Sequence, residues 1–307
     1  MITKIVAYLA ATLLMCCSYI ACANIINNPS QHAGVNQQII TTDWSIAETL
    51  LMLNAPVVGI GDVVQYNNWV VMPNIPNNVI DLGLRAQPNM EALINANANT
   101  LINSSWFQKI LPPELINDRY TLYAIDFYNN DGLSWQNTIE QTLKLGEITK
   151  REDQANALIA NVEASIDKNG LRISEFKDRP IAMVQFIDSR HLRIYGNNSL
   201  YGVVLNKLHL HNAWQKPTNG WGFMQISLLD LANLPPNTLL IVIAPYPTNI
   251  AEKLNHNQIW LQLPFINHQN YRVIPAVWAF GALPSMQRFS DLLTDSLLNP
   301  KPYSWRK

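Results

Sequence analysis

The chain reads EDQANALIANVEASIDKNGLRI from residue 152 to residue 173. Leu158, Val162 and Ile166 recur at helical spacing, and charged side chains fall on the other faces. As a single helix this stretch would be about 33 Å long at the standard rise per residue. Short apolar strands alternate with amphipathic helices on both sides of it. We therefore interpret it as a rigid strut that joins two α/β halves.

The helical pattern begins before this stretch, at about Asn137, and we expect Gly146 to divide it into two pieces. The predicted fold class is α/β, with two α/β lobes of mainly parallel sheet joined by one long rigid interlobe helix. The predicted divisions are a signal peptide at residues 1–23, an N-terminal lobe at 38–136, a helical segment at 137–173 and a C-terminal lobe at 174–303.

The first lobe shows strand and helix patterns in alternation. Asp43 is a candidate cap for its first helix, and Pro88 is placed to open a later helix, because proline suits a first helical turn. We expect strands at 38–42, 57–61, 79–82, 100–103 and 122–127, and helices at 45–54, 88–97 and 113–117.

The second lobe resumes the alternation. Its most apolar segment, residues 239–244, is typical of a strand covered on both faces. We expect strands at 180–186, 191–195, 239–244 and 271–274, and helices at 200–205, 249–255, 259–261 and 284–298.

The first residues predict export. Lys4 is the only charged residue before Asp43, and an apolar run from Ile5 to Leu14 precedes the small-residue pattern Ala21-Cys22-Ala23. This pattern is typical of a cleaved signal peptide and predicts a periplasmic protein. Retention as a membrane helix is the weaker alternative, because the run is short. A lipid anchor on Cys22 is a further, weaker alternative.

Cysteine and charge exclude several classes. Cys16, Cys17 and Cys22 all lie in the leader, so the mature chain would have no disulfide, no thiolate nucleophile and no zinc–cysteine site. The whole chain has 21 basic and 22 acidic residues, and cleavage removes one more positive charge. This balance provides no basic surface for nucleic acid, and we expect no nucleic-acid partner.

Large rings stand in four segments that the pattern predicts to be loops. Aromatic loops near glycine and after strands are suited to lining a cleft between lobes, where ligand sites are common. The alternative is that the rings fill the lobe interface. These rings are Tyr66, Trp69, Trp106, Phe107, Trp221, Phe223, Trp278 and Phe280.

Arg85 follows a predicted strand and stands among apolar residues, where a charge is costly unless it is paired. Its guanidinium has five donors in a fixed fork, which suits a ligand rich in oxygen. The alternative is a structural ion pair with Asp62 or Asp81.

An ordered series of short motifs resembles the periplasmic ferric hydroxamate-binding proteins that serve siderophore ABC importers. Each motif is short, but the series runs from about Gln38 to the closing helix. The motifs are DWSIAE (43–48), NWV (68–70), VIDLGLR (79–85), IDSRH (187–191), NNSL (197–200), NAWQ (212–215), WG (221–222) and PAVW (275–278).

The resemblance implies a two-lobed binding protein with an aromatic interlobe cleft. Arg85 would donate hydrogen bonds to hydroxamate oxygens, and Trp69, Trp221 and Trp278 would pack on the siderophore. The hydrogen-bonding tyrosine of the family falls at Trp106 or Phe107, so a phenol is missing there. Three further departures from the family pattern also make the predicted pocket more apolar: Ala279, Phe280 and Phe223.

The resemblance also implies how the protein would work. The iron would be held by the siderophore, with no cofactor and no metal ligand from the protein. The partners would be a ferric hydroxamate siderophore and the permease of an ABC importer, and we expect a monomer. Docking would use Glu114 and Asp230, although Asp230 is shifted by one position and both could be ordinary solvated carboxylates.

Other functions remain as alternatives. The same architecture serves carriers of catecholates, haem or cobalamin, although several acidic groups would call for more pocket cations than Arg85. A metal-ion binder could use His209 and His211. Catalysis is disfavoured, because the chain has neither a Gly-x-Ser-x-Gly nor a His-Glu-x-x-His motif, and we expect Asp188 and His191 to serve a turn.

Overall fold

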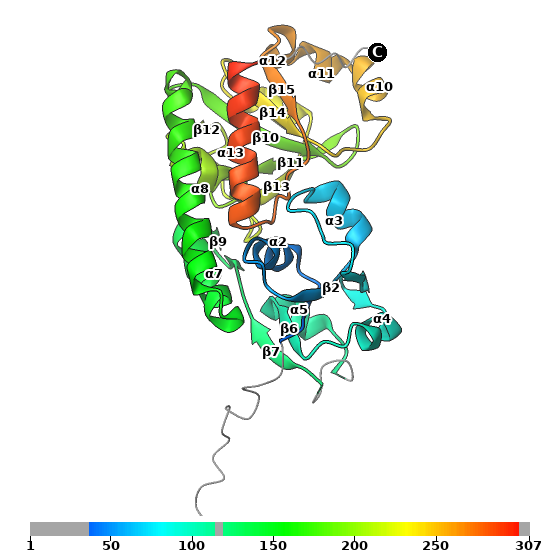
Figure 1. The fold of residues 1–307 in the computed structure, drawn as a ribbon. Helices are drawn as coiled ribbons and strands as arrows, with labels where there is room; N and C mark the ends of the chain where they lie inside the picture. The colour runs from blue at the N-terminus through cyan, green and yellow to red at the C-terminus, as the bar shows by residue number, and fades with distance from the viewer. Residues whose placement is uncertain (1–36, 114–118, 301–307) are drawn as a thin grey trace, which may run out of the picture. The chain divides into compact units, whose positions relative to one another are not determined.

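The computed structural model describes residues 37–113 and 119–300 of the chain. Figure 1 shows two groups of strands, one formed by the earlier residues and one by the later residues, with helices packed around each. The predicted α/β class is confirmed. The predicted signal peptide and the predicted helix at 113–117 fall wholly or largely outside the described residues. Within those residues, no helix combines the length and apolar character needed to span a bilayer.

The first sheet has five strands, all parallel, in the order β3-β2-β1-β6-β7. Ile39 and Ile40 of its middle strand are both fully buried and point to opposite faces, so the sheet is covered on both sides. Its strands are β1 (Ile39–Thr41), β2 (Val57–Ile60), β3 (Ile80–Asp81), β6 (Thr100–Asn103) and β7 (Thr121–Ala124).

Four helices lie in the connections between successive strands of this sheet. The carboxylate of Asp43 accepts a hydrogen bond from the backbone N–H of Ser45, which confirms the predicted cap. The helices are α2 (Trp44–Met52), α3 (Val63–Trp69), α4 (Met90–Asn95) and α5 (Ser105–Ile110). Pro88 does not open α4 as predicted. It lies in the small ladder of β4 (Gly83–Leu84) and β5 (Gln87–Pro88), and Asn89 caps the helix instead.

The second sheet is mixed, in the order β13-β11-β10-β14-β15, with β12 beside β10. All five residues of β14 are buried, as their apolar run predicted. The antiparallel strand β13 has no counterpart in the predicted elements. The strands are β10 (Pro180–Phe186), β11 (His191–Tyr195), β12 (His211–Asn212), β13 (Phe223–Ser227), β14 (Leu239–Ile243) and β15 (Tyr271–Ile274).

Short elements complete the two sheets. The helices of the second half are α9 (Leu200–Lys207), α10 (Ile250–Asn255), α11 (Gln258–Gln262), α12 (Pro264–Asn267) and α13 (Leu283–Leu298). The remaining pieces are the pair β8 (Tyr128–Asn129) and β9 (Gly132–Leu133), and two 3₁₀ turns at Ser174–Phe176 and Leu229–Asn233.

Two helices lie between the sheets in the chain, α7 (Trp135–Thr149) and α8 (Glu152–Arg172). The division falls at Lys150, which ends α7 in the left-handed conformation, and not at Gly146 as predicted. Gly146 is buried within α7 at its contact with α8, where an added Cβ would lie 2.7 Å from the Cβ of Ala155. Its small size is therefore needed for helix packing. Helix α8 also packs against α9, and it lies beside α13 (Figure 1).

One hydrophobic core runs through both halves. It contains Leu50 of α2, Leu145 of α7, Val162 of α8 and Phe289 of α13, all fully buried. This shared core packs the first-half helix α2 against α13. The residues next to these two helices are thereby held close together.

Candidate functional site

A cavity of about 460 Å³ is lined by residues from both halves of the chain. Its size is within the range of small-molecule sites. Aromatic rings form most of the wall, and the charged groups are Asp43, Arg85 and Asp126. The lining is Asp43, Ser45, Arg85, Ala86, Ser104, Trp106, Phe107, Ile125, Asp126, Phe127, Tyr128, Trp221, Phe223, Trp278 and Phe280.

Arg85 lies between the short strands β4 and β5. Its Nε donates to the backbone oxygen of Thr42 at 3.0 Å, and its guanidinium carbon lies 4.2, 4.8 and 5.4 Å from the ring centroids of Trp44, Phe107 and Trp278. Burial lowers the pKa of Arg85, and the nearby carboxylate of Asp43 opposes this shift. A guanidinium nevertheless remains protonated in proteins, so the cavity contains a fixed cation.

The alternative that Arg85 forms a structural ion pair is wrong. Asp62 and Asp81 accept backbone hydrogen bonds from Gln65 and Gly83. Among the described residues, the single ion pair within bonding distance joins Asp188 and His191. The terminal nitrogens of Arg85 have no hydrogen bond to any described residue, so they are free to bind a ligand.

A contiguous set of rings forms part of the cavity wall. Trp278 and Phe280 have ring centroids 5.2 Å apart, and Trp221 lies 5.6 Å from Phe280. The turn that carries Trp221 requires Gly222, which has φ of 77° and whose added Cβ would come within 2.4 Å of the Cα of Ser199.

The eight ring positions singled out in the sequence divide into two groups. Six of them line the cavity, namely Trp106, Phe107, Trp221, Phe223, Trp278 and Phe280. Arg85, the other predicted ligand-binding side chain, lines it too. Trp69 does not line it. It lies behind Trp278, with ring centroids 6.3 Å apart, and Tyr66 is fully buried in the core.

Two of the four predicted aromatic loops are helices. Trp69 ends α3, and Trp106 and Phe107 lie in the first turn of α5. Asp126 fixes that turn, because its carboxylate accepts hydrogen bonds from the backbone N–H and the hydroxyl of Ser105 at 2.8 and 2.5 Å. Trp106 is consequently held with 51% of its surface exposed at the cavity.

Tyr128 was not predicted as a site residue. Its ring lies 5.7 Å from that of Trp221 and 6.3 Å from that of Phe280. Burial raises the pKa of its hydroxyl well above the usual value, so it is a neutral donor. The available signal was the pair Phe127-Tyr128 soon after a strand, the same pattern that marked the other rings.

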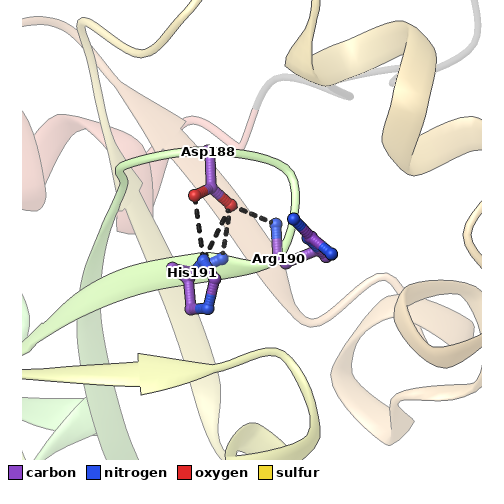
Figure 2. A network of polar contacts seen from close by, with 3 residues as sticks. All are labelled: Asp188, Arg190 and His191. Atoms are coloured by element: carbon purple, nitrogen blue, oxygen red, sulfur yellow. Dashed lines mark hydrogen bonds and ion pairs between the residues drawn. The ribbon is translucent and has the colours of Figure 1, made fainter.

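Asp188 closes the turn between β10 and β11, as predicted. Figure 2 shows its carboxylate facing the backbone N–H groups of Arg190 and His191, at 2.7 and 2.9 Å, and the His191 Nδ1, at 2.9 Å. The hydrogen bond with His191, together with those from the backbone, lowers the pKa of Asp188 to about 2. Ser199 caps α9 through the N–H of Gly202. These contacts give Asp188, His191 and Ser199 structural roles.

His209 and His211 line a second, polar hollow with Asp167. Among residues 37–113 and 119–300, no group of three or more His, Cys, Asp or Glu side chains is arranged to hold a metal ion. The metal-binding alternative therefore has no support from the geometry.

Of the two predicted docking carboxylates, the structure describes Asp230 alone. Glu114 lies outside the described residues. Asp230 is partly exposed and accepts hydrogen bonds from the backbone N–H and hydroxyl of Ser227 at its Oδ2, at 2.8 and 2.7 Å, which lowers its pKa.

Known proteins match nearly all of the described chain. The family model for periplasmic binding proteins matches residues 39–277. The iron(3+)-hydroxamate-binding protein FhuD of Escherichia coli (strain K12) is 27% identical over 272 residues, which cover 88% of this chain and 90% of that protein.

Solved structures share the fold. The siderophore-binding protein FhuD of Vibrio cholerae, bound to Fe³⁺-Desferal, superposes with a TM-score of 0.80 at 21% identity, covering 87% of this chain and 100% of that one. The periplasmic heme-binding protein HutB of Vibrio cholerae superposes with a TM-score of 0.67 at 16% identity, over 87% and 100% of the two chains.

Proposed function

This chain belongs to the periplasmic binding protein family, and from that premise we propose that it captures ferric hydroxamate siderophores and delivers them to an ABC permease. The observation that carries the proposal is the cavity itself, in which one partly buried arginine with unbonded terminal nitrogens lies among aromatic rings. In this proposal the protein is a carrier with no catalytic step. It works as a monomer in the periplasm after loss of the leader.

The chemistry of the cavity supports a hydroxamate complex. Three hydroxamates fill the coordination sphere of Fe³⁺ with hard oxygen ligands and neutralise its charge, so the protein need supply no metal ligand. The complex is then a compact object with an oxygen rim and an apolar frame. Arg85 would bind the rim by charge-assisted hydrogen bonds, and Trp221, Trp278 and Phe280 would contact the frame.

The charge balance of the cavity favours this class over catecholates. A ferric catecholate carries several negative charges, whereas the cavity offers Arg85 alone against the carboxylates of Asp43 and Asp126. Carriage of another chelate, such as haem, is the second candidate. The structural similarity to a heme-binding protein supports it, since the fold accommodates more than one kind of chelate.

The permease would dock at one acidic residue on each half of the chain. Asp230 is available in the second half, with both of its hydrogen bonds on one carboxylate oxygen. Glu114 is the proposed counterpart in the first half. Both assignments rest on the family resemblance.

The test is a fluorescence titration of the mature protein, because three cavity residues are tryptophans. The panel contains ferrichrome, Fe³⁺-Desferal, a ferric catecholate, haem, cobalamin and iron-free Desferal. We expect saturable quenching by the two ferric hydroxamates after inner-filter correction, and none by iron-free Desferal. Saturation by haem or cobalamin alone would contradict the hydroxamate assignment.

A further inference from the structure

The N-terminus of α13 is capped from the other half of the chain. Its cap residue, Ala282, has no side-chain acceptor to offer, although the first N–H groups of a helix need partners. Glu48 of α2 supplies one. Its Oε1 accepts from the N–H of Ala282 at 2.6 Å, and its Oε2 accepts from the hydroxyl of Ser285 at 2.5 Å. Glu48 is fully buried, so no water competes for these bonds.

The contact leaves no spare room. An added Cβ on Gly281 would lie 2.3 Å from the hydroxyl of Ser285 and 2.8 Å from Oε1 of Glu48. The N–H of Gly281 donates to the oxygen of Trp278 at 3.2 Å and closes a turn. The turn that carries Trp278 and Phe280 therefore rests directly on the Glu48 carboxyl.

A second side chain from the first half holds the same turn. The hydroxyl of Tyr128 donates to the backbone oxygen of Ala279 at 3.2 Å, between the two ring-bearing residues. The indole N–H of Trp278 is buried without a hydrogen-bond partner among the described residues. The position of this ring is thus set by its backbone and by packing, and two first-half side chains hold that backbone.

We propose that Glu48 and Tyr128 are positioning residues that tie the turn at residues 278–282 to the first half of the chain, and so fix Trp278 and Phe280 for ligand capture. The role in capture rests on the proposed function. The tie itself concerns the ligand-free protein and can be tested without a ligand.

Glu48 is expected to act as a neutral acid. Burial raises its pKa to about 8, against the opposing effect of the hydrogen bonds from Ser285 and Ala282, and the nearby Asp43 raises it further. At pH 7 glutamine should therefore replace Glu48 well, because like the neutral acid it keeps an acceptor for the N–H of Ala282 and presents a donor to Ser285, whose hydroxyl can turn to accept. Alanine leaves the helix N-terminus uncapped and buried.

The experiment compares Glu48→Gln, Glu48→Ala and Tyr128→Phe with the parent. The first measurement is amide hydrogen exchange of the peptide covering residues 277–285 in the ligand-free protein. The second is the dissociation rate of Fe³⁺-Desferal by stopped-flow fluorescence. We expect faster exchange and roughly tenfold faster dissociation for Glu48→Ala, about fivefold for Tyr128→Phe, and values within about threefold of the parent for Glu48→Gln.

Asn169→Ala is the matched control. Asn169 of α8 is buried and donates to Ser290 and Asp291 of α13, away from the cavity, at 3.1 and 2.7 Å. Its loss should lower the melting temperature but leave both the 277–285 exchange and the dissociation rate unchanged. A general loss of stability would move these readouts in the control as well.

The outcomes separate the two proposals. Unchanged exchange in both Glu48→Ala and Tyr128→Phe would overturn the positioning role. Faster exchange with unchanged dissociation would overturn its part in ligand capture. If the parent binds no ferric hydroxamate, the proposed function fails, while the exchange result still decides whether Glu48 and Tyr128 hold the turn. If Glu48→Ala does not fold, the exchange and dissociation rates of Tyr128→Phe, compared with those of Glu48→Gln, decide both questions.

Discussion

Arg85 combines a cost in stability with a proposed gain in binding. Its side chain is partly buried, three aromatic rings surround the guanidinium, and one donor alone is bonded within the described residues. Burial lowers its pKa, which means that the surroundings disfavour the charged form. Such a group is expected where function, and not folding, requires a charge.

Arg85→Met tests this separation, because it keeps an unbranched apolar stem, shorter than that of arginine, and removes the charge. We expect affinity for Fe³⁺-Desferal to fall roughly tenfold to hundredfold, since charge-assisted hydrogen bonds contribute about 1.5–3 kcal/mol. We expect the free energy of unfolding to stay the same or rise, because an unpaired buried charge is removed. Fluorescence titration and urea unfolding measure the two effects.

Arg179→Met is the control for Arg85→Met. Arg179 is also partly buried, and it donates to Asn270 at 2.8 Å, outside the cavity lining. Its replacement should leave the affinity unchanged. Equal affinity in Arg85→Met and the parent would remove Arg85 from the proposed binding site.

At the scale of elements, strands were predicted better than the contacts between elements. The sequence pattern gives β6, β10, β11 and β15 their observed bounds, because short segments rich in β-branched and aromatic residues favour strands. Strand β13 was missed, because the neighbouring residues Met224 and Gln225 are both exposed, so neither an apolar run nor a regular alternation marks it. Helices α3 and α5 were taken for loops because each is short and dense in polar residues and rings.

The site was predicted in its residue types more than in its geometry. Rings near strand ends identified most of the cavity wall, but nothing in the local pattern separated the cavity residue Trp106 from the core residue Tyr66. Glu48 could not be predicted either. Its partners Ala282 and Ser285 are 234 and 237 residues further along the chain, so only the folded chain brings them together.

Gly146 gives an element-scale prediction, because helix propensity and packing oppose each other there. Propensity favours Gly146→Ala by about 1 kcal/mol. The new Cβ would lie 2.7 Å from the Cβ of Ala155 and 3.2 Å from the backbone oxygen of Arg151. We expect the clash to win and the free energy of unfolding to fall by roughly 1–3 kcal/mol in urea titration.

Gly170→Ala in α8 is the matched variant for Gly146→Ala. The nearest atoms to its added Cβ are backbone atoms of Leu208 at 3.5 Å, which is an ordinary contact. Helix propensity should therefore determine the effect of this substitution, and the free energy of unfolding should be unchanged or rise by up to about 1 kcal/mol. Equal effects of the two substitutions would show that the α7–α8 contact does not control stability.

At the scale of the whole molecule, the two halves are joined by more than the chain between them. Helix α8 packs against α13, the core is continuous from α2 to α13, and Glu48 and Tyr128 bond across the halves. Hinge closure would break buried hydrogen bonds and open the shared core, and each unsatisfied buried group costs about 1–3 kcal/mol. Binding energy spent on closure would be lost to affinity.

We therefore predict that ligand capture occurs with little movement of the halves. Small-angle scattering of the mature protein should give the same radius of gyration, within error, without ligand and with saturating Fe³⁺-Desferal. A hinge-closing binder would contract on loading.

Gly281→Leu provides the internal contrast, because its side chain would collide with Ser285 and Glu48 and separate the halves at the tie. We expect this variant to have a larger radius without ligand and to contract when ligand is added. Contraction of the parent to the same extent would show that the tie does not restrain the halves.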